Sequence, residues 1–169
     1  ALNRKSISML QEIRSLRPSD GIPMVISGCI GPRGDGYQPL EKMVAGEAER
    51  YHREQIEALK AAGADLVTAF TLTYVEEAVG ITRAARSAKI PAVISFTLET
   101  DGRLPSGMNI GDALEAVDEA TGSGPAYYMI NCAHPSHFTD ALAPDAAWSR
   151  RIRAIRANAS TKSHAELDQ

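Results

Sequence analysis

Cys132 is the residue of this sequence whose type and position best suit chemistry. It follows Asn131 and the apolar run 127–130, so its thiol is expected at the end of a buried strand. A thiolate in that position can bind zinc or act as a nucleophile. A buried, inert cysteine would have the same surroundings in the sequence, and this alternative stays open.

Three further residues could join Cys132 at such a site. His134 and His137 complete a Cys-x-His-x-x-His string. Side chains this close together on a short loop rarely converge on one ion, so we expect these histidines to shape the loop or to contact a substrate. Cys29 lies near the end of the first apolar segment, where its thiol could face the same site, but we do not expect it to hold a metal.

Polar and reactive side chains gather after several different apolar runs. The segments are 29–37, 71–74, 97–103, 131–137 and 158–162. Groups that converge from the carboxyl ends of successive strands are typical of the active site of a (β/α)8 TIM barrel. No Gly-x-Gly-x-x-Gly follows the first run, which disfavours a dinucleotide-binding sheet. A complete barrel needs roughly 250 residues, so about five of its eight strands are expected here.

The elements that must position these side chains alternate between short apolar runs and helical patterns, which predicts an α/β fold with a parallel sheet. Strands are expected at 24–27, 65–70, 91–96, 127–130 and, less strongly patterned, 152–157. A helix is expected over 46–62. Capping boxes at Thr73/Glu76, Asp112/Glu115 and Ser163/Glu166 predict three more helix starts.

Length and composition set the remaining limits. The 169 residues suggest one domain over 1–169, and 44% apolar with 23% charged residues is ordinary for a globular protein. A net charge of -3 argues against nucleic-acid binding through a basic field. No run approaches the ~18 apolar residues of a membrane span, nothing reads as a signal peptide, and two cysteines make no secreted framework. These features predict a cytoplasmic protein without nucleic-acid or membrane partners.

An ordered set of motifs resembles the homocysteine S-methyltransferase family. The motifs are Gly28-Cys29-Ile30-Gly31-Pro32, the segment from Tyr51-His52 to Ala64-Asp65, Ser95-Phe96-Thr97 with Asp101-Gly102-Arg103-Leu104, and Ile130-Asn131-Cys132. The resemblance runs from about Met24 to Asn158. It implies a zinc-dependent TIM barrel that transfers a methyl group from an onium donor, of the S-methylmethionine or betaine type, to homocysteine or a related thiol. The product from homocysteine is methionine, so the resemblance also implies a role in methionine biosynthesis.

The resemblance also implies roles for individual residues. Three cysteine thiolates hold the zinc in that family, and Cys132 matches the first of them. The adjacent cysteine pair that supplies the other two is absent from this sequence, which opens within a helical pattern and closes at a helix start. We therefore expect an internal part of a longer protein, incomplete as an enzyme by itself. Thr71, Asn131 and Asn158 fall at positions expected to bind substrate, although Asn131 could instead satisfy backbone groups. No residue is assigned a catalytic role of its own.

Phe70 departs from the family pattern, because many members carry Glu at this position to hold the homocysteine amino group. Two other functions therefore stay open: a metal-free lyase or aldolase-like barrel, and a degenerate barrel that binds a thiol or a partner. The glycine-rich segment 31–36 is expected to form a lid over the barrel mouth rather than a phosphate loop, since it lacks the Gly-Lys-Ser/Thr ending. Besides a small-molecule thiol and a methyl donor, open sheet edges invite self-association, so a homo-oligomer also stays open.

Overall fold

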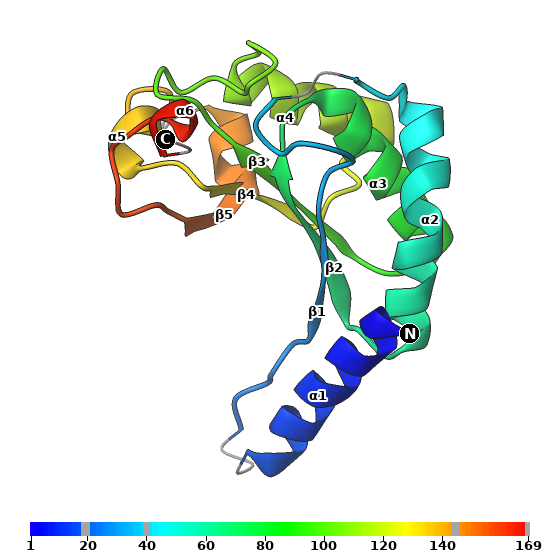
Figure 1. Ribbon diagram of the computed structural model, residues 1–169. Helices are drawn as coiled ribbons and strands as arrows, with labels where there is room; N and C mark the ends of the chain where they lie inside the picture. The colour runs from blue at the N-terminus through cyan, green and yellow to red at the C-terminus, as the bar shows by residue number, and fades with distance from the viewer. Residues whose placement is uncertain (18–20, 39–40, 143–145, 168–169) are drawn as a thin grey trace.

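Five parallel strands form one sheet whose spatial order is the order of the chain. The computed structural model describes residues 1–17, 21–38, 41–142 and 146–167. The strands are β1 (Ser27–Ile30), β2 (Leu66–Leu72), β3 (Ala92–Thr97), β4 (Tyr127–Asn131) and β5 (Ile152–Arg156). All four neighbouring pairs are parallel. Each strand pairs with the next one along the chain, as in a barrel wall, so the expected α/β fold with part of a TIM barrel is confirmed (Figure 1).

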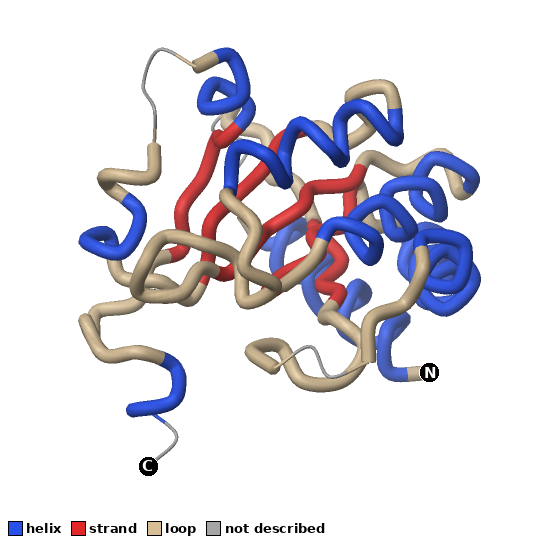
Figure 2. The backbone as a smooth tube through the Cα atoms, turned by 90° about the horizontal axis from the view of Figure 1, so that it is seen from above, coloured by secondary structure: helices blue, strands red, loops and turns tan. Residues whose placement is uncertain are grey.

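Helices connect the strands and cover one face of this sheet. They are α1 (Leu2–Leu16), α2 (Ala45–Ala61), α3 (Val75–Ser87), α4 (Ile110–Thr121), the short α5 (Pro135–Phe138), the 3-10 helix Ala147–Arg151 and α6 (His164–Leu167). Seen from above, the longer helices line one side of the curved sheet (Figure 2). Within the described residues, no helix combines the length and apolar character needed to cross a bilayer.

The core lies between the sheet and the helix layer. Every residue of β3 is buried, as expected for a central strand of a parallel sheet. On β4, Tyr128 and Ile130 are buried while Tyr127 and Met129 are only half-buried. The hydroxyl of Tyr128 donates to Asp118 on α4 at 2.8 Å, which identifies its side as the helix-facing one. The opposite face, which in a barrel would be the interior, therefore carries the half-buried Tyr127 and Met129 and ends at the buried Asn131.

The first strand lies later than the sequence predicts. It was expected at 24–27, but β1 spans Ser27–Ile30. Pairing with β2 begins at Ser27 opposite Leu66, and Val25 is left 59% exposed. Ile26, the residue before β1, bonds Asp65 with its backbone: its N–H donates to the Asp65 carboxylate and its carbonyl accepts from the Asp65 N–H. Strand pairing rather than local hydrophobicity sets this boundary.

Two of the three expected capping boxes are wrong. The N-cap of α3 is Tyr74 and that of α4 is Asn109, and neither side chain caps its helix. Thr73 is buried, and its hydroxyl has no partner among the described residues, while Asp112 lies inside the first turn of α4. The third box is confirmed: the Ser163 hydroxyl and the Glu166 carboxylate bond each other and the other residue's backbone N–H.

The arginine-rich segment 150–156 contacts the rest of the fold through two of its side chains. Arg151 forms an ion pair with Asp118 at 2.9 Å and donates to the Pro125 carbonyl, which ties the 3-10 helix to α4. The guanidinium of Arg156 lies 5.6 Å from the centroid of the Phe70 ring. Arg151 is half-buried and Arg156 is exposed, so the Arg151 ion pair is the better shielded of the two contacts near β5.

The helices α2 and α3 pack closely at Gly80, where an added side chain would have no room. A Cβ at this position would lie 2.5 Å from the Cβ of Ala48, 2.6 Å from the Glu49 nitrogen and 2.7 Å from the Ala45 carbonyl oxygen. We expect Gly80→Ala to lower the free energy of unfolding by about 2 kcal/mol, because backbone atoms cannot yield as a side chain can. Urea unfolding measures this difference.

Gly46→Ala is the matched control, since a Cβ at Gly46 would meet only the Arg50 guanidinium at 3.8 Å. Because alanine favours the helix, this variant should be as stable as the wild type or up to about 1 kcal/mol more stable. Equal stability of the two variants would show that α2 and α3 can accommodate a side chain at position 80 without cost, against the prediction.

Candidate functional site

The predicted site residues lie together at the carboxyl ends of the strands. Thr71 is the next-to-last residue of β2, and Asn131 ends β4. Cys132 follows Asn131 directly, and Asn158 lies just beyond β5. The backbones of Thr71 and Cys132 are left-handed, with φ of 61° and 55°. Non-glycine residues rarely adopt this conformation, and each instance costs on the order of 1–3 kcal/mol unless the surroundings hold it. The contacts that hold these two residues define the site.

Asn131 is the residue that joins the strand ends. Its side chain is buried, and its Oδ1 accepts from the Thr71 backbone N–H at 3.0 Å and from the Ser95 hydroxyl at 2.5 Å. Its Nδ2 donates to the Thr71 hydroxyl at 2.9 Å. Asn131 therefore links β2, β3 and β4 through one amide. Of the two roles considered for this residue, the structure displays the satisfaction of a backbone group.

Cys132 is fixed through its own backbone from both sides. Its N–H donates to the Arg156 carbonyl at 3.1 Å, and its carbonyl accepts from Asn158 Nδ2 at 3.1 Å. The Asn158 N–H in turn donates to the Ala133 carbonyl at 3.0 Å. The half-buried Cys132 lies in a shallow depression, too small to hold a water molecule, which is lined by Leu98, Glu99, Thr100, Cys132, His137, Lys162, Ser163 and His164.

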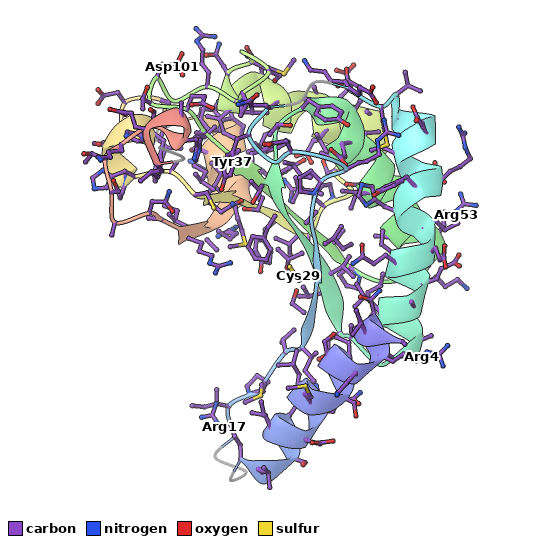
Figure 3. The ribbon with its side chains drawn as sticks, in the orientation of Figure 1. Arg4, Arg17, Cys29, Tyr37, Arg53 and Asp101 are labelled. Atoms are coloured by element: carbon purple, nitrogen blue, oxygen red, sulfur yellow. The ribbon has the colours of Figure 1, made fainter. Side chains whose placement is uncertain are left out.

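The two neighbouring histidines shape the loop after Cys132, as one reading of the sequence predicts. His134 caps α5 by accepting from the Ser136 N–H at 3.2 Å. The Nε2 of His137 donates to the Thr161 carbonyl at 2.9 Å. Cys29 lies exposed on β1, opposite Thr68 in the strand register, lower than the strand ends (Figure 3). Across the described residues, no three His, Cys, Asp or Glu side chains lie close enough together to hold a metal ion.

The glycine-rich loop after β1 lies against the site. Gly36 is so close to Thr71 that a Cβ at Gly36 would be 3.0 Å from Thr71 Cγ2. The Tyr37 ring stacks on the His164 ring with centroids 4.0 Å apart. The Nε2 of His164 lies 3.3 Å from the Thr97 hydroxyl. Tyr37 belongs to the polar segment 29–37 singled out in the sequence, but its contact with His164 could not be predicted, because local spacing does not relate the first loop to α6.

Tyr74 holds the far end of the segment that connects β1 to α2, at Met43. Its buried hydroxyl accepts from the Met43 N–H at 3.1 Å, and burial raises the pKa of the phenol to about 12 from its ordinary value of 10.0. The folded state thus binds this proton more tightly than the unfolded state. The associated stability is complete below pH 10 and is lost as pH rises through 12.

We therefore expect Tyr74→Phe to flatten the alkaline loss of stability. Between pH 7 and 9 the free energies of unfolding of variant and wild type should differ by a constant amount, because the phenol is protonated in both states. Between pH 10 and 12 the wild type should fall more steeply. Urea unfolding at a series of pH values measures both slopes, and parallel curves throughout would contradict the prediction.

An open wall of parallel βα units with polar groups at the carboxyl ends of its strands defines part of a TIM-barrel enzyme. The family model described as homocysteine S-methyltransferase matches residues 1–168. The chain belongs to the homocysteine S-methyltransferase family, a family of methyltransferase enzymes. The family expected from the sequence is thereby confirmed.

Solved structures similar to this chain include three of the homocysteine methyltransferase MmuM from Escherichia coli. The metallated form has a TM-score of 0.74, the oxidised form 0.73 and the apo form 0.72, each at 20% sequence identity. The alignments cover 95% of this chain and 67%, 67% and 70% of those chains. At this identity the likeness establishes the fold. The comparison with curated protein sequences gave no match.

Proposed function

We propose that this protein transfers a methyl group from an onium donor, of the S-methylmethionine or betaine type, to the thiol of homocysteine, giving methionine. The observation that carries the proposal is the family match over residues 1–168. The convergence of Thr71, Asn131, Cys132 and Asn158 at one end of the sheet supports it. The reaction would belong to methionine biosynthesis, and we propose a cytoplasmic location.

Zinc is the metal we propose for this reaction, with Cys132 as one ligand. Thiolate sulfur is a preferred zinc donor, and Cys132 is half-buried with its backbone fixed on both sides. The described residues supply this one thiolate and no complete ligand set. A bound zinc ion would stabilise a substrate thiolate near neutral pH, where a free thiol of pKa about 8.5 is mostly protonated. One of the similar solved structures is described as metallated.

The remaining residues would act by binding and orientation. Asn131 holds Thr71 in its left-handed conformation and so presents the end of β2 toward Cys132. Asn158 holds the Cys132 carbonyl and thereby sets the direction of the thiol. Positioning of the thiol and the methyl donor in line can supply a large share of the rate of such a transfer.

Phe70 and Arg156 bear on the substrate. The ring of Phe70 cannot accept a hydrogen bond from a substrate ammonium group, and it lies under the Arg156 guanidinium. A cation beside this position favours binding of a carboxylate there. We therefore propose that the amino acid substrate meets Arg156 through its carboxylate, with its amino group held elsewhere.

The test is methionine formation by the full-length protein, supplied with zinc and homocysteine. S-methylmethionine and betaine are offered in separate reactions, and mass spectrometry detects the methionine. Formation with either donor supports the proposal and selects the donor. No methionine with either, in a protein that binds zinc, would overturn it and leave the thiol-binding alternative.

A further inference from the structure

The loop after β1 is held at two places, which we call its anchors. We call residues 31–38 the strap. At its start, the Arg33 N–H donates to Glu77 Oε1 at 2.7 Å, and the Arg33 guanidinium pairs with Glu47 at 2.8 Å. At its end, the Asp35 carboxylate accepts from the backbone N–H groups of Tyr37 and Gln38, which fixes a turn. The strap is therefore a shaped segment rather than a loose connection.

The first anchor is buried and ionisable. Glu77 on α3 is 0% exposed, His52 on α2 is 1% exposed, and His52 Nε2 lies 2.9 Å from Glu77 Oε1. Because the Arg33 N–H can only donate, Oε1 serves as an acceptor, and His52 Nε2 therefore donates to it. Glu77 Oε2 and His52 Nδ1 have no partner among the described residues. Burying such an ionisable pair costs desolvation energy that the attraction between its members often only offsets. A contribution to the stability of the fold therefore does not by itself explain the presence of Glu77 and His52 here.

The second anchor spans the mouth of the site. Gly36 contacts Thr71 on one side, and Tyr37 stacks on His164 on the other. His164 and Cys132 line the same shallow depression. Figure 3 shows Tyr37 at the level of α6, above the position of Cys29. The strap thus runs over the strand ends, from Thr71 to the depression that His164 and Cys132 line.

We propose that Glu77 and His52 are positioning residues that hold the strap across this mouth and so limit access to the Cys132 thiol. Glu77 acts through the Arg33 N–H, and His52 acts by orienting the Glu77 carboxylate. The proposal rests on the proposed function for the identity of the site. It adds a role for two residues of the helix layer, Glu77 on α3 and His52 on α2.

The test is the rate at which iodoacetamide alkylates Cys132 in the full-length protein with a chelator present, followed by peptide mass spectrometry. Cys29, which is exposed, serves as the internal reference thiol. Glu77→Ala removes the acceptor for Arg33, and we expect Cys132 to react about tenfold faster relative to Cys29, the factor that corresponds to one lost charge-assisted hydrogen bond. Hydrogen exchange of residues 31–38 should rise in parallel.

Two control variants separate strap release from general loosening. Glu77→Gln keeps an acceptor oxygen in the same place and should restore the slow rate. Thr82→Ala removes a buried hydrogen bond, to the Ala78 carbonyl, on the same helix. It should leave the Cys132 rate unchanged. A folded Glu77→Ala protein with the wild-type rate, or equal acceleration by Thr82→Ala, would overturn the proposal.

If Glu77→Ala does not fold, the same alkylation experiment is made with Tyr37→Ala, which removes the ring that stacks on His164. Faster alkylation of Cys132 in this variant supports the proposal that the strap limits access to the thiol, and an unchanged rate overturns that proposal. The readout needs no methyl transfer. If the variants speed alkylation of Cys132 but the wild type forms no methionine, the role of the strap stands and the proposed function is rejected. If the wild type forms methionine but the variants leave the alkylation rate unchanged, only the role of the strap is rejected.

Discussion

Cys132→Ser is expected to abolish zinc binding and methionine formation by the full-length protein. Serine keeps the size and the backbone contacts to Arg156 and Asn158, but its hydroxyl does not ionise near neutral pH and is a poor zinc ligand. Loss of an outer-shell partner alone typically costs 10–100-fold in metal affinity, so removing a direct ligand should cost more than about 100-fold. Elemental analysis and the methionine assay measure the two losses.

Cys29→Ser is the matched control, since Cys29 is the other cysteine of the sequence and lies exposed on β1. It should retain about one zinc per chain and wild-type activity. Zinc content that survives in Cys132→Ser and disappears in Cys29→Ser would place the metal elsewhere. Activity that survives in both variants would favour a barrel that works without a metal.

The second large effect is expected at Asn131. Asn131→Ala leaves the Thr71 N–H, the Thr71 hydroxyl and the Ser95 hydroxyl without their partner in a buried place. Unsatisfied buried groups cost about 1–3 kcal/mol each, so we expect the free energy of unfolding to fall by about 3 kcal/mol. Because Thr71 also loses the contact that holds its left-handed backbone, kcat/KM should fall about 100-fold, as misplaced reacting groups do.

Ser95→Ala provides the comparison, because it removes one of the three hydrogen bonds and leaves Asn131 bonded to Thr71. We expect it to lose about 1 kcal/mol of stability and to keep most activity. Urea unfolding and steady-state kinetics give the two quantities. If Asn131→Ala is no less stable than Ser95→Ala, the amide is not the link between the strands.

The strands could be predicted because each is a short apolar run bounded by turn residues, and four of the five lie within two residues of their expected limits. β1 could not be placed, because Met24–Ile26 is more apolar than the Gly28-Cys29 pair that enters the sheet. The capping boxes at Thr73 and Asp112 failed for two different reasons: Asp112 lies inside the first turn of α4, whereas Thr73 is buried. A Thr side chain drawn into the core cannot cap a helix, and the local sequence does not reveal its burial.

Some features of the candidate site could likewise be predicted from the sequence, and others could not. Thr71, Asn131, Cys132 and Asn158 could be predicted to lie together, since the carboxyl ends of parallel strands meet at one edge. Their roles toward a metal or substrate stay predictions. The contacts of Glu77 with His52 and of Tyr37 with His164 could not be predicted, because they join different elements and leave no regular spacing.

The strand order has a consequence for how the molecule assembles. Each strand pairs with the strand made just before it, so the sheet can grow along the chain as the polypeptide emerges during synthesis. The bond between Thr71 and Asn131 is different, since it joins residues 60 positions apart. Thr71 must wait for β4 before its unfavourable backbone conformation is secured. The scaffold can therefore form step by step, whereas the site becomes competent only when its last contributing strands arrive.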